Sequence, residues 1–149
     1  MNSLGSTGVE LDRDIIEKRI ASIVDYLSDL EQIRGLSFEE YRSDTLRKRG
    51  IEKTIINIVQ AAIDINNYLL AKVSKTYAAD NYDSFIQMGE HNIIPREFAV
   101  RIAPVAGLRN RLVHEYDKID DAIAHESIQE VLGLFPEYIE KIREFLKRA

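Results

Sequence analysis

The sequence predicts an all-α protein, an up-and-down bundle of four to five helices. Apolar residues recur at spacings of three and four along most of the chain, and no segment sustains the two-residue alternation of a strand. Hydrophobic residues make up 45% of the chain and charged residues 30%, as in globular proteins. The 149 residues contain no internal repeat. We therefore expect one helical domain over 9–149, preceded by a flexible tail over 1–8.

The first helix is expected from about Val9 to Arg34, where Gly35 can end it. Its apolar residues form one amphipathic stripe: Ile16, Ile20, Ile23, Leu27 and Leu30. The segment Ser37–Glu40 has the pattern of a capping box, which predicts the start of a shorter helix ending at Gly50.

A long central helix is expected over 51–75, followed by a loop and a short helix over 77–92. Pro95 suits the first turn of the next helix. Pro104 and Gly107 inside that helix predict a kink just ahead of Arg109.

The last helix is expected to follow a polar junction at 117–121, which offers good N-cap residues. Its apolar side again alternates spacings of three and four: Ile128, Val131, Phe135, Tyr138, Ile142 and Phe145. Pro136 predicts a bend within it.

Composition excludes several classes of function. Cysteine is absent, so the chain has no disulfide framework, thiol nucleophile or cysteine zinc site. A formal net charge of −5 argues against a non-specific DNA coat. The start of the chain resembles no secretion signal, and the longest apolar run falls short of the roughly 20 residues of a membrane span. We expect a cytoplasmic protein that does not contact membranes.

Two basic clusters stand out in this acidic chain. The first lies between Arg42 and Lys53 and includes three consecutive cations, Arg47, Lys48 and Arg49. The second lies in the later half of the chain and consists of Arg101, Arg109 and Arg111. A solvated helix face is the commoner explanation of such clusters. The alternative is a local contact for nucleic acid, for which Arg47, Lys48, Arg49 and Arg111 are the candidates.

The segment 109–116, "RNRLVHEY", holds an unusual set of polar groups in a helix that should pack a core. Asn110 and His114 are four residues apart and share a helix face, so the amide can bond one imidazole nitrogen and fix the tautomer. Arg109 and His114 are five apart, about 140° around a regular helix and about 7.5 Å along it. Their convergence needs a distorted helix end, the long reach of arginine, or a second copy of the chain.

These groups suit phosphoryl chemistry. Histidine can take and give a proton near neutral pH, and arginine offers a charged planar fork for phosphate oxygens. With only three histidines and no His-Glu-x-x-His pattern, we predict no metal site and no cofactor. The 2′-hydroxyl of RNA is then the convenient nucleophile. From the spacing alone, however, a structural histidine and a surface arginine are the more common explanation.

The pattern Arg-polar-x-x-x-His, here Arg109, Asn110 and His114, resembles the signature of the HEPN superfamily of helical ribonucleases. The longer segment 107–120, "GLRNRLVHEYDKID", resembles that of the HepT toxins, and 50–72 resembles the central helix of that family. The similarity extends from about Leu11 onward.

This resemblance implies the toxin of a two-gene system, a symmetric homodimer whose motifs line a shared cleft and cut RNA without a metal. The resemblance also implies that Arg109 and His114 catalyse the cleavage, and that Asn110 orients these groups or contacts phosphate. The implied partner is an MntA-type nucleotidyltransferase antitoxin, which transfers AMP to Tyr116. A bulky anion beside His114 would fill the cleft and repel the phosphates of the substrate.

A second hypothesis belongs to a different class. The chain would be a non-catalytic helical dimer, a scaffold or nucleotide-binding partner of a nucleotidyltransferase, with Tyr116 as an interface aromatic. A complex with such an enzyme is expected under both hypotheses, so only catalysis distinguishes them.

Overall fold

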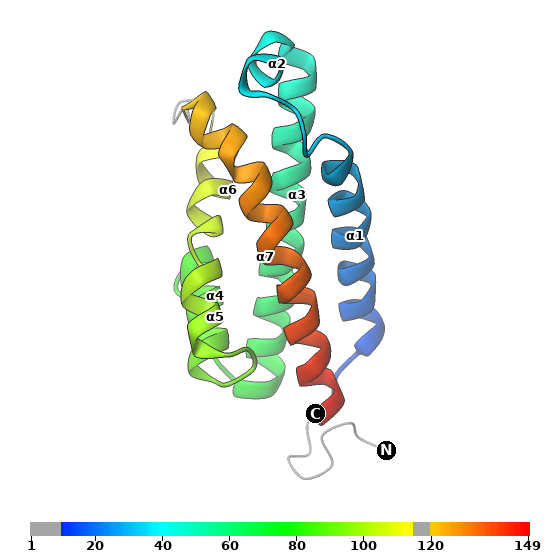
Figure 1. Cartoon of the computed structure of the whole chain (residues 1–149). Helices are drawn as coiled ribbons and strands as arrows, with labels where there is room; N and C mark the ends of the chain where they lie inside the picture. The colour runs from blue at the N-terminus through cyan, green and yellow to red at the C-terminus, as the bar shows by residue number, and fades with distance from the viewer. Residues whose placement is uncertain (1–9, 115–119) are drawn as a thin grey trace.

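The computed structural model of the chain describes residues 10–114 and 120–149, and within these ranges the regular structure is entirely helical (Figure 1). The tail predicted over 1–8 lies outside the described residues. The elements are α1 (Arg13–Gln32), α2 (Phe38–Ser43), α3 (Thr45–Leu69), the π-helical turn η1 (Leu70–Ser74), α4 (Asn81–Glu90), α5 (Arg96–Ile102), α6 (Val105–Val113) and α7 (Asp121–Arg148).

The long helices run alternately up and down, with α3 packed against α1, α4, α6 and α7 (Figure 1). Helix α2 lies at the upper end of the bundle in this view, beside the start of α3. Helices α5 and α6 follow one another upward, so the end of α6 and the start of α7 reach the same upper end. The fold predicted from hydrophobic periodicity is confirmed.

The capping box predicted at Ser37 is confirmed. Ser37 Oγ accepts from the Glu40 amide at 3.1 Å, and Glu40 Oε1 accepts from the Ser37 amide at 2.9 Å. The prediction that this helix continues to Gly50 is wrong, because α2 ends at Ser43. Asp44 then starts α3 by accepting the Arg47 amide at 3.1 Å, a strong N-cap that the periodicity did not reveal.

Gly50 therefore lies inside α3 rather than at its boundary. A glycine in a helix interior costs only about 1 kcal/mol relative to alanine. The burial of Ile51 and Ile55, which follow it on the core side, outweighs that cost.

The kink predicted at Pro104 is a division into two helices. Helix α5 ends at Ile102 and α6 begins at Val105, with Pro104 between them. Proline has no amide hydrogen to donate, which interrupts the helical hydrogen bonds. Pro136, by contrast, lies within α7, which continues on both sides of it. The last helix opens as predicted in the polar junction, where Asp120 Oδ1 accepts the Ala122 amide at 2.7 Å.

Most of the residues predicted to face inward are buried in one core: Ile16, Ile20, Ile23, Leu30, Ile128, Val131, Phe135, Tyr138, Ile142 and Phe145. The same core contains Ile55, Val59, Ala62 and Leu69 of α3. This core also contains polar groups. The Tyr138 hydroxyl donates to Asn66 Oδ1 at 2.6 Å, and Asn66 Nδ2 donates to Ser84 Oγ at 3.1 Å. Burial raises the pKa of the Tyr138 hydroxyl well above its usual value, so it keeps its proton in more alkaline solution than an exposed tyrosine does.

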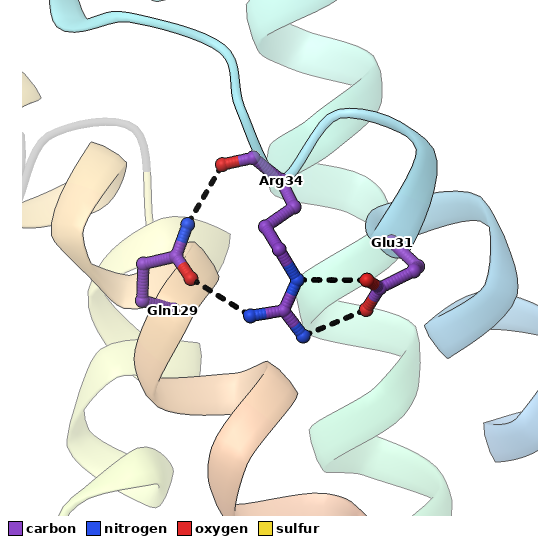
Figure 2. Close-up of polar contacts among 3 residues, drawn as sticks. All are labelled: Glu31, Arg34 and Gln129. Atoms are coloured by element: carbon purple, nitrogen blue, oxygen red, sulfur yellow. Dashed lines mark hydrogen bonds and ion pairs between the residues drawn. The ribbon is translucent and has the colours of Figure 1, made fainter.

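Arg34 fastens the turn after α1 to α7 (Figure 2). Its Nε and Nη2 atoms each donate to the Glu31 carboxylate at 2.7 Å. Its Nη1 atom donates to Gln129 Oε1 at 3.2 Å, and Gln129 Nε2 donates back to the Arg34 carbonyl at 2.8 Å. Because both the side chain and the backbone of Arg34 are held, α7 is fixed against the connection that leads into α2.

Candidate active site

Helix α6 ends at Val113, so His114 stands at the point where the chain leaves the helix. Its backbone dihedral angles, φ −92° and ψ 106°, are extended, while its amide still donates to the Asn110 carbonyl at 3.2 Å. The separation from Arg109 expected for a regular helix therefore does not apply. The helix thus ends immediately before His114, which is the feature that the first of the three routes to convergence requires.

Arg109 is held by the side chain of its neighbour Asn110. Arg109 Nη1 donates to Asn110 Oδ1 at 3.1 Å, and the guanidinium is partly buried. Within the described ranges, Arg109 Nε is the buried side-chain nitrogen that has no hydrogen-bond partner. The guanidinium thus lies half inside the protein and is oriented mainly through Nη1.

Asn110 also receives a hydrogen bond from another helix. Asn81, the first residue of α4, donates from Nδ2 to Asn110 Oδ1 at 3.2 Å. The amide oxygen of Asn110 therefore accepts from both Arg109 and Asn81, which supports an orienting role for Asn110. The hydrogen bond from the Asn110 amide to the His114 ring remains a prediction.

His114 is exposed at the surface. Arg111, in the last turn of α6, is exposed as well. Tyr116, the predicted site of modification, lies outside the described residues.

The basic candidates at the start of α3 lie at the same end of the bundle as the end of α6 (Figure 1). Arg47 and Arg49 are exposed, and Arg47 Nη2 donates to the Glu40 carbonyl at 2.6 Å. Lys48 Nζ lies 2.8 Å from Asp121 Oδ1, at the start of α7. The fold thus places the basic residues at the start of α3 and those at the end of α6 at the same end of the bundle. Lys48, however, already forms an ion pair with Asp121.

Two polar side chains, on α3 and α4, have partners that no local spacing predicts. Asp64 of α3 pairs with Arg19 of α1 at 3.3 Å. Asn81 was not anticipated, although it contacts the motif directly. Its 29-residue separation from Asn110 carries no periodic signal, and an asparagine at a helix start is ordinary.

In the part of the chain that the structure describes, no three histidine, aspartate or glutamate side chains gather as metal ligands would. Nor does any described helix combine the length and the apolar character that crossing a membrane requires.

Comparison with known proteins places this chain among helical nucleases. The family profile described as ribonuclease HepT-like matches residues 23–147. A tRNA nuclease HepT from Aphanizomenon flos-aquae is 39% identical over 132 residues, which cover 89% of this chain and 90% of that protein. An mRNA nuclease HepT from Shewanella oneidensis is 25% identical over 130 residues, covering 87% and 97% of the two chains.

The fold has close counterparts among solved structures. A tri-AMPylated HEPN toxin from Shewanella oneidensis, in complex with an MNT antitoxin, superposes with a TM-score of 0.79 at 24% identity and covers 88% of this chain and 98% of its own. A toxin–antitoxin structure with AMP-PNP superposes equally well, with a TM-score of 0.79. The profile match spans the motif and most of the bundle, and the curated relative shares most of its length with this chain. The resemblance seen in the motif is confirmed, and this chain belongs to the ribonuclease HepT-like family.

Proposed function

We propose that this chain is a metal-independent ribonuclease, the toxin of a toxin–antitoxin pair, in which Arg109 and His114 carry out RNA cleavage. The match to the ribonuclease HepT-like family over 23–147 carries this proposal, because the matched range contains both residues. The position of Arg109, Asn110 and His114 at the exposed end of α6 agrees with a substrate as large as RNA.

The proposed reaction uses the nucleophile that RNA itself provides. His114 accepts the proton of a 2′-hydroxyl, whose oxygen attacks the adjacent phosphorus while the bond to the 5′ oxygen breaks. The leaving 5′ oxygen takes up a proton from water and His114 returns its proton to solvent, so the products end in a 2′,3′-cyclic phosphate and a 5′-hydroxyl. Arg109 stabilises the charge that develops on the equatorial phosphate oxygens.

We further propose that two copies of the chain form the active assembly. A twofold dimer would let Arg109 and His114 act on one phosphodiester even where a single helix end does not bring them together. Large apolar side chains are exposed on α4, α5 and α6, at Tyr82, Val100 and Val113, as they are on α1, α3 and α7.

The proposed partner is an MntA-type nucleotidyltransferase antitoxin. A structural relative of this fold is a tri-AMPylated toxin bound to an MNT antitoxin. In this chain the proposed acceptor is the Tyr116 hydroxyl, which attacks the α-phosphate of ATP and displaces pyrophosphate. Each AMP adds a negative charge two residues beyond His114, where it repels the RNA backbone.

The test is cleavage of labelled RNAs by purified, unmodified chain in the presence of EDTA, with the intact mass measured first. Wild type is expected to cut and to leave 2′,3′-cyclic phosphates. Arg109→Ala and His114→Ala are expected to lose at least about 10²-fold in rate. His91→Ala is the matched control, because His91 is also exposed at a helix end, where its Nε2 atom lies 3.3 Å from Thr76 Oγ1.

Cleavage that persists in His114→Ala at the wild-type rate would eliminate the proposed mechanism. Unmodified wild type that leaves both tRNA and mRNA intact would favour the non-catalytic scaffold. Loss of cleavage on adding EDTA, restored by a divalent cation, would overturn metal independence alone.

A further inference from the structure

A series of hydrogen bonds connects the buried core to the guanidinium of Arg109. It begins in the core, where Tyr138 donates to Asn66 and Asn66 donates to Ser84, at 2.6 and 3.1 Å. Ser84 Oγ donates in turn to the Asn81 carbonyl at 2.8 Å. All three of these core residues are buried, so the backbone at the start of α4 is fixed by the interior of the bundle.

The side chain of Asn81 extends this connection to the motif. Asn81 Nδ2 donates to Asn110 Oδ1 at 3.2 Å, and the same oxygen accepts from Arg109 Nη1 at 3.1 Å. The backbone of Asn81 is thus anchored to the core, while its amide reaches α6.

The directions of these bonds follow from the chemistry of arginine. A guanidinium can only donate, so the Asn110 atom that faces Arg109 must be the amide oxygen. The atom of Asn81 that faces this oxygen must then be its nitrogen. Asn110 therefore has one orientation that serves both neighbours, and Asn81 holds Asn110 in that orientation.

This support matters because, among the described residues, the hydrogen bond that orients the Arg109 side chain is the one to Asn110. Arginine loses up to about 2 kcal/mol of rotamer entropy when it is fixed, and arginine alone would sample many positions. In the described ranges its buried Nε has no hydrogen-bond partner, so the bond to Asn110 is the polar contact that sets the guanidinium. A small rotation of the Asn110 side chain would therefore move the Arg109 guanidinium, which must meet the phosphate.

We propose that Asn81 is a positioning residue for RNA cleavage, which acts on Arg109 through the amide of Asn110. This inference rests on the proposed function for its catalytic consequence. Its structural content, that Asn81 orders Arg109, stands independently and can be measured independently.

The kinetic test compares wild type with Asn81→Ala and Asn81→Asp in RNA cleavage. Both variants lose the donor to Asn110, and Asn81→Asp does so with almost no change in size. We expect kcat to fall about tenfold in each, which corresponds to about 1.4 kcal/mol, while KM changes less than about twofold. Helix α4 keeps its cap in both variants, because Asp80 Oδ1 accepts the Asp83 amide at 2.7 Å.

Asn67→Ala is the matched control, because Asn67 is an exposed helical asparagine on α3. It should leave kcat unchanged, and all the variants should unfold at the wild-type temperature. In an Asn110→Ala background, Asn81→Ala should have little further effect, since the group through which it acts is gone. Equal kcat in wild type and Asn81→Ala, or additive losses in the double variant, would overturn the inference.

A second measurement does not depend on activity. The Nε–Hε resonance of Arg109, assigned by its loss in Arg109→Lys, should be sharp and dispersed in wild type. In Asn81→Ala it should move toward the position of a mobile arginine, and in Asn67→Ala it should not. An unchanged resonance in Asn81→Ala would overturn the inference. A wild type that is inert toward RNA but shows the resonance change would remove the proposed function and leave the positioning role in place.

Discussion

Lys48 Nζ lies 2.8 Å from Asp121 Oδ1, and this pair joins the start of α3 to the start of α7. The two side chains are only 27% and 37% exposed, so the pair is partly shielded from solvent. It lies at the end of the bundle where α6 finishes (Figure 1). Three consecutive cations, Arg47, Lys48 and Arg49, are predicted to contact RNA. Of these, Lys48 joins α3 to α7 through its ion pair with Asp121, whereas Arg49 does not.

The first prediction separates these two basic residues. Arg49→Gln should weaken RNA binding and reduce the slope of log affinity against log salt by about 0.7–0.9, because one phosphate contact is lost. Its effect on stability should be under about 0.5 kcal/mol, as for an exposed side chain. Lys48→Gln should instead lower the free energy of unfolding by up to about 1 kcal/mol, because Asp121 loses its partner. Fluorescence titration at several salt concentrations and urea unfolding measure the two effects; equal salt slopes in wild type and Arg49→Gln would exclude Arg49 from the RNA contact.

A second prediction concerns the shape of the Arg109 cation. Arg109→Lys keeps the charge but loses the planar fork and the donor that reaches Asn110. Single-turnover cleavage should slow by about 10²-fold, similar to the loss of one transition-state donor. Arg101→Lys is the control, because Arg101 is exposed on α5 and pairs with Glu137 at 3.0 Å. Full activity in Arg109→Lys would show that charge alone is sufficient at this position.

The third prediction follows from two buried tyrosines. Burial raises the pKa of Tyr138, and burial together with the nearby Glu52 carboxylate raises that of Tyr41. In the unfolded chain both titrate near pH 10. Above that pH the unfolded state releases protons that the folded state retains, so stability falls as pH rises.

Each tyrosine should contribute up to about 1.4 kcal/mol of lost stability per pH unit above pH 10, until its folded pKa is reached. Tyr138→Phe should make this decline less steep. At pH 7 the same variant should lower the free energy of unfolding by about 1–3 kcal/mol, since buried Asn66 loses its donor. Tyr77→Phe is the control, because Tyr77 is 85% exposed. Urea unfolding between pH 7 and 11 tests both parts, and an identical pH slope in wild type and Tyr138→Phe would contradict the assignment.

The fourth prediction concerns the close approach of α4 and α5. A Cβ atom on Gly89 would meet Ala99 Cβ at 2.6 Å and Arg96 Cα at 3.2 Å. Gly89→Ala should therefore lower the free energy of unfolding by about 1–3 kcal/mol, because the backbones must separate. Gly133→Ala, in α7, meets no atom within 4 Å and should stabilise by about 0.5–1 kcal/mol. Thermal unfolding of the two variants tests these expectations. If Gly89→Ala left the free energy of unfolding unchanged, α4 and α5 would be able to move apart freely.

The all-α fold, the capping box at Ser37 and the break at Pro104 could be predicted because each depends on local chemistry. Periodic burial, a side-chain cap and a missing amide hydrogen act over a few residues and leave a readable pattern. The helix boundary predicted at Gly50 was wrong because it does not depend on local chemistry alone. Whether a glycine ends a helix depends on the packing of the residues around it, and Ile51 and Ile55 are buried in the core.

The candidate site divides in the same way. The sequence by itself determined the motif, since Arg109, Asn110 and His114 are neighbours along one helix end and their residue types specify the chemistry. Only the tertiary structure decided that Asn81 contacts Asn110, that Lys48 pairs with Asp121, and that Asp64 turns toward α1. Such contacts join helices that are distant in the chain, and their geometry is set by how the whole core packs rather than by any local spacing.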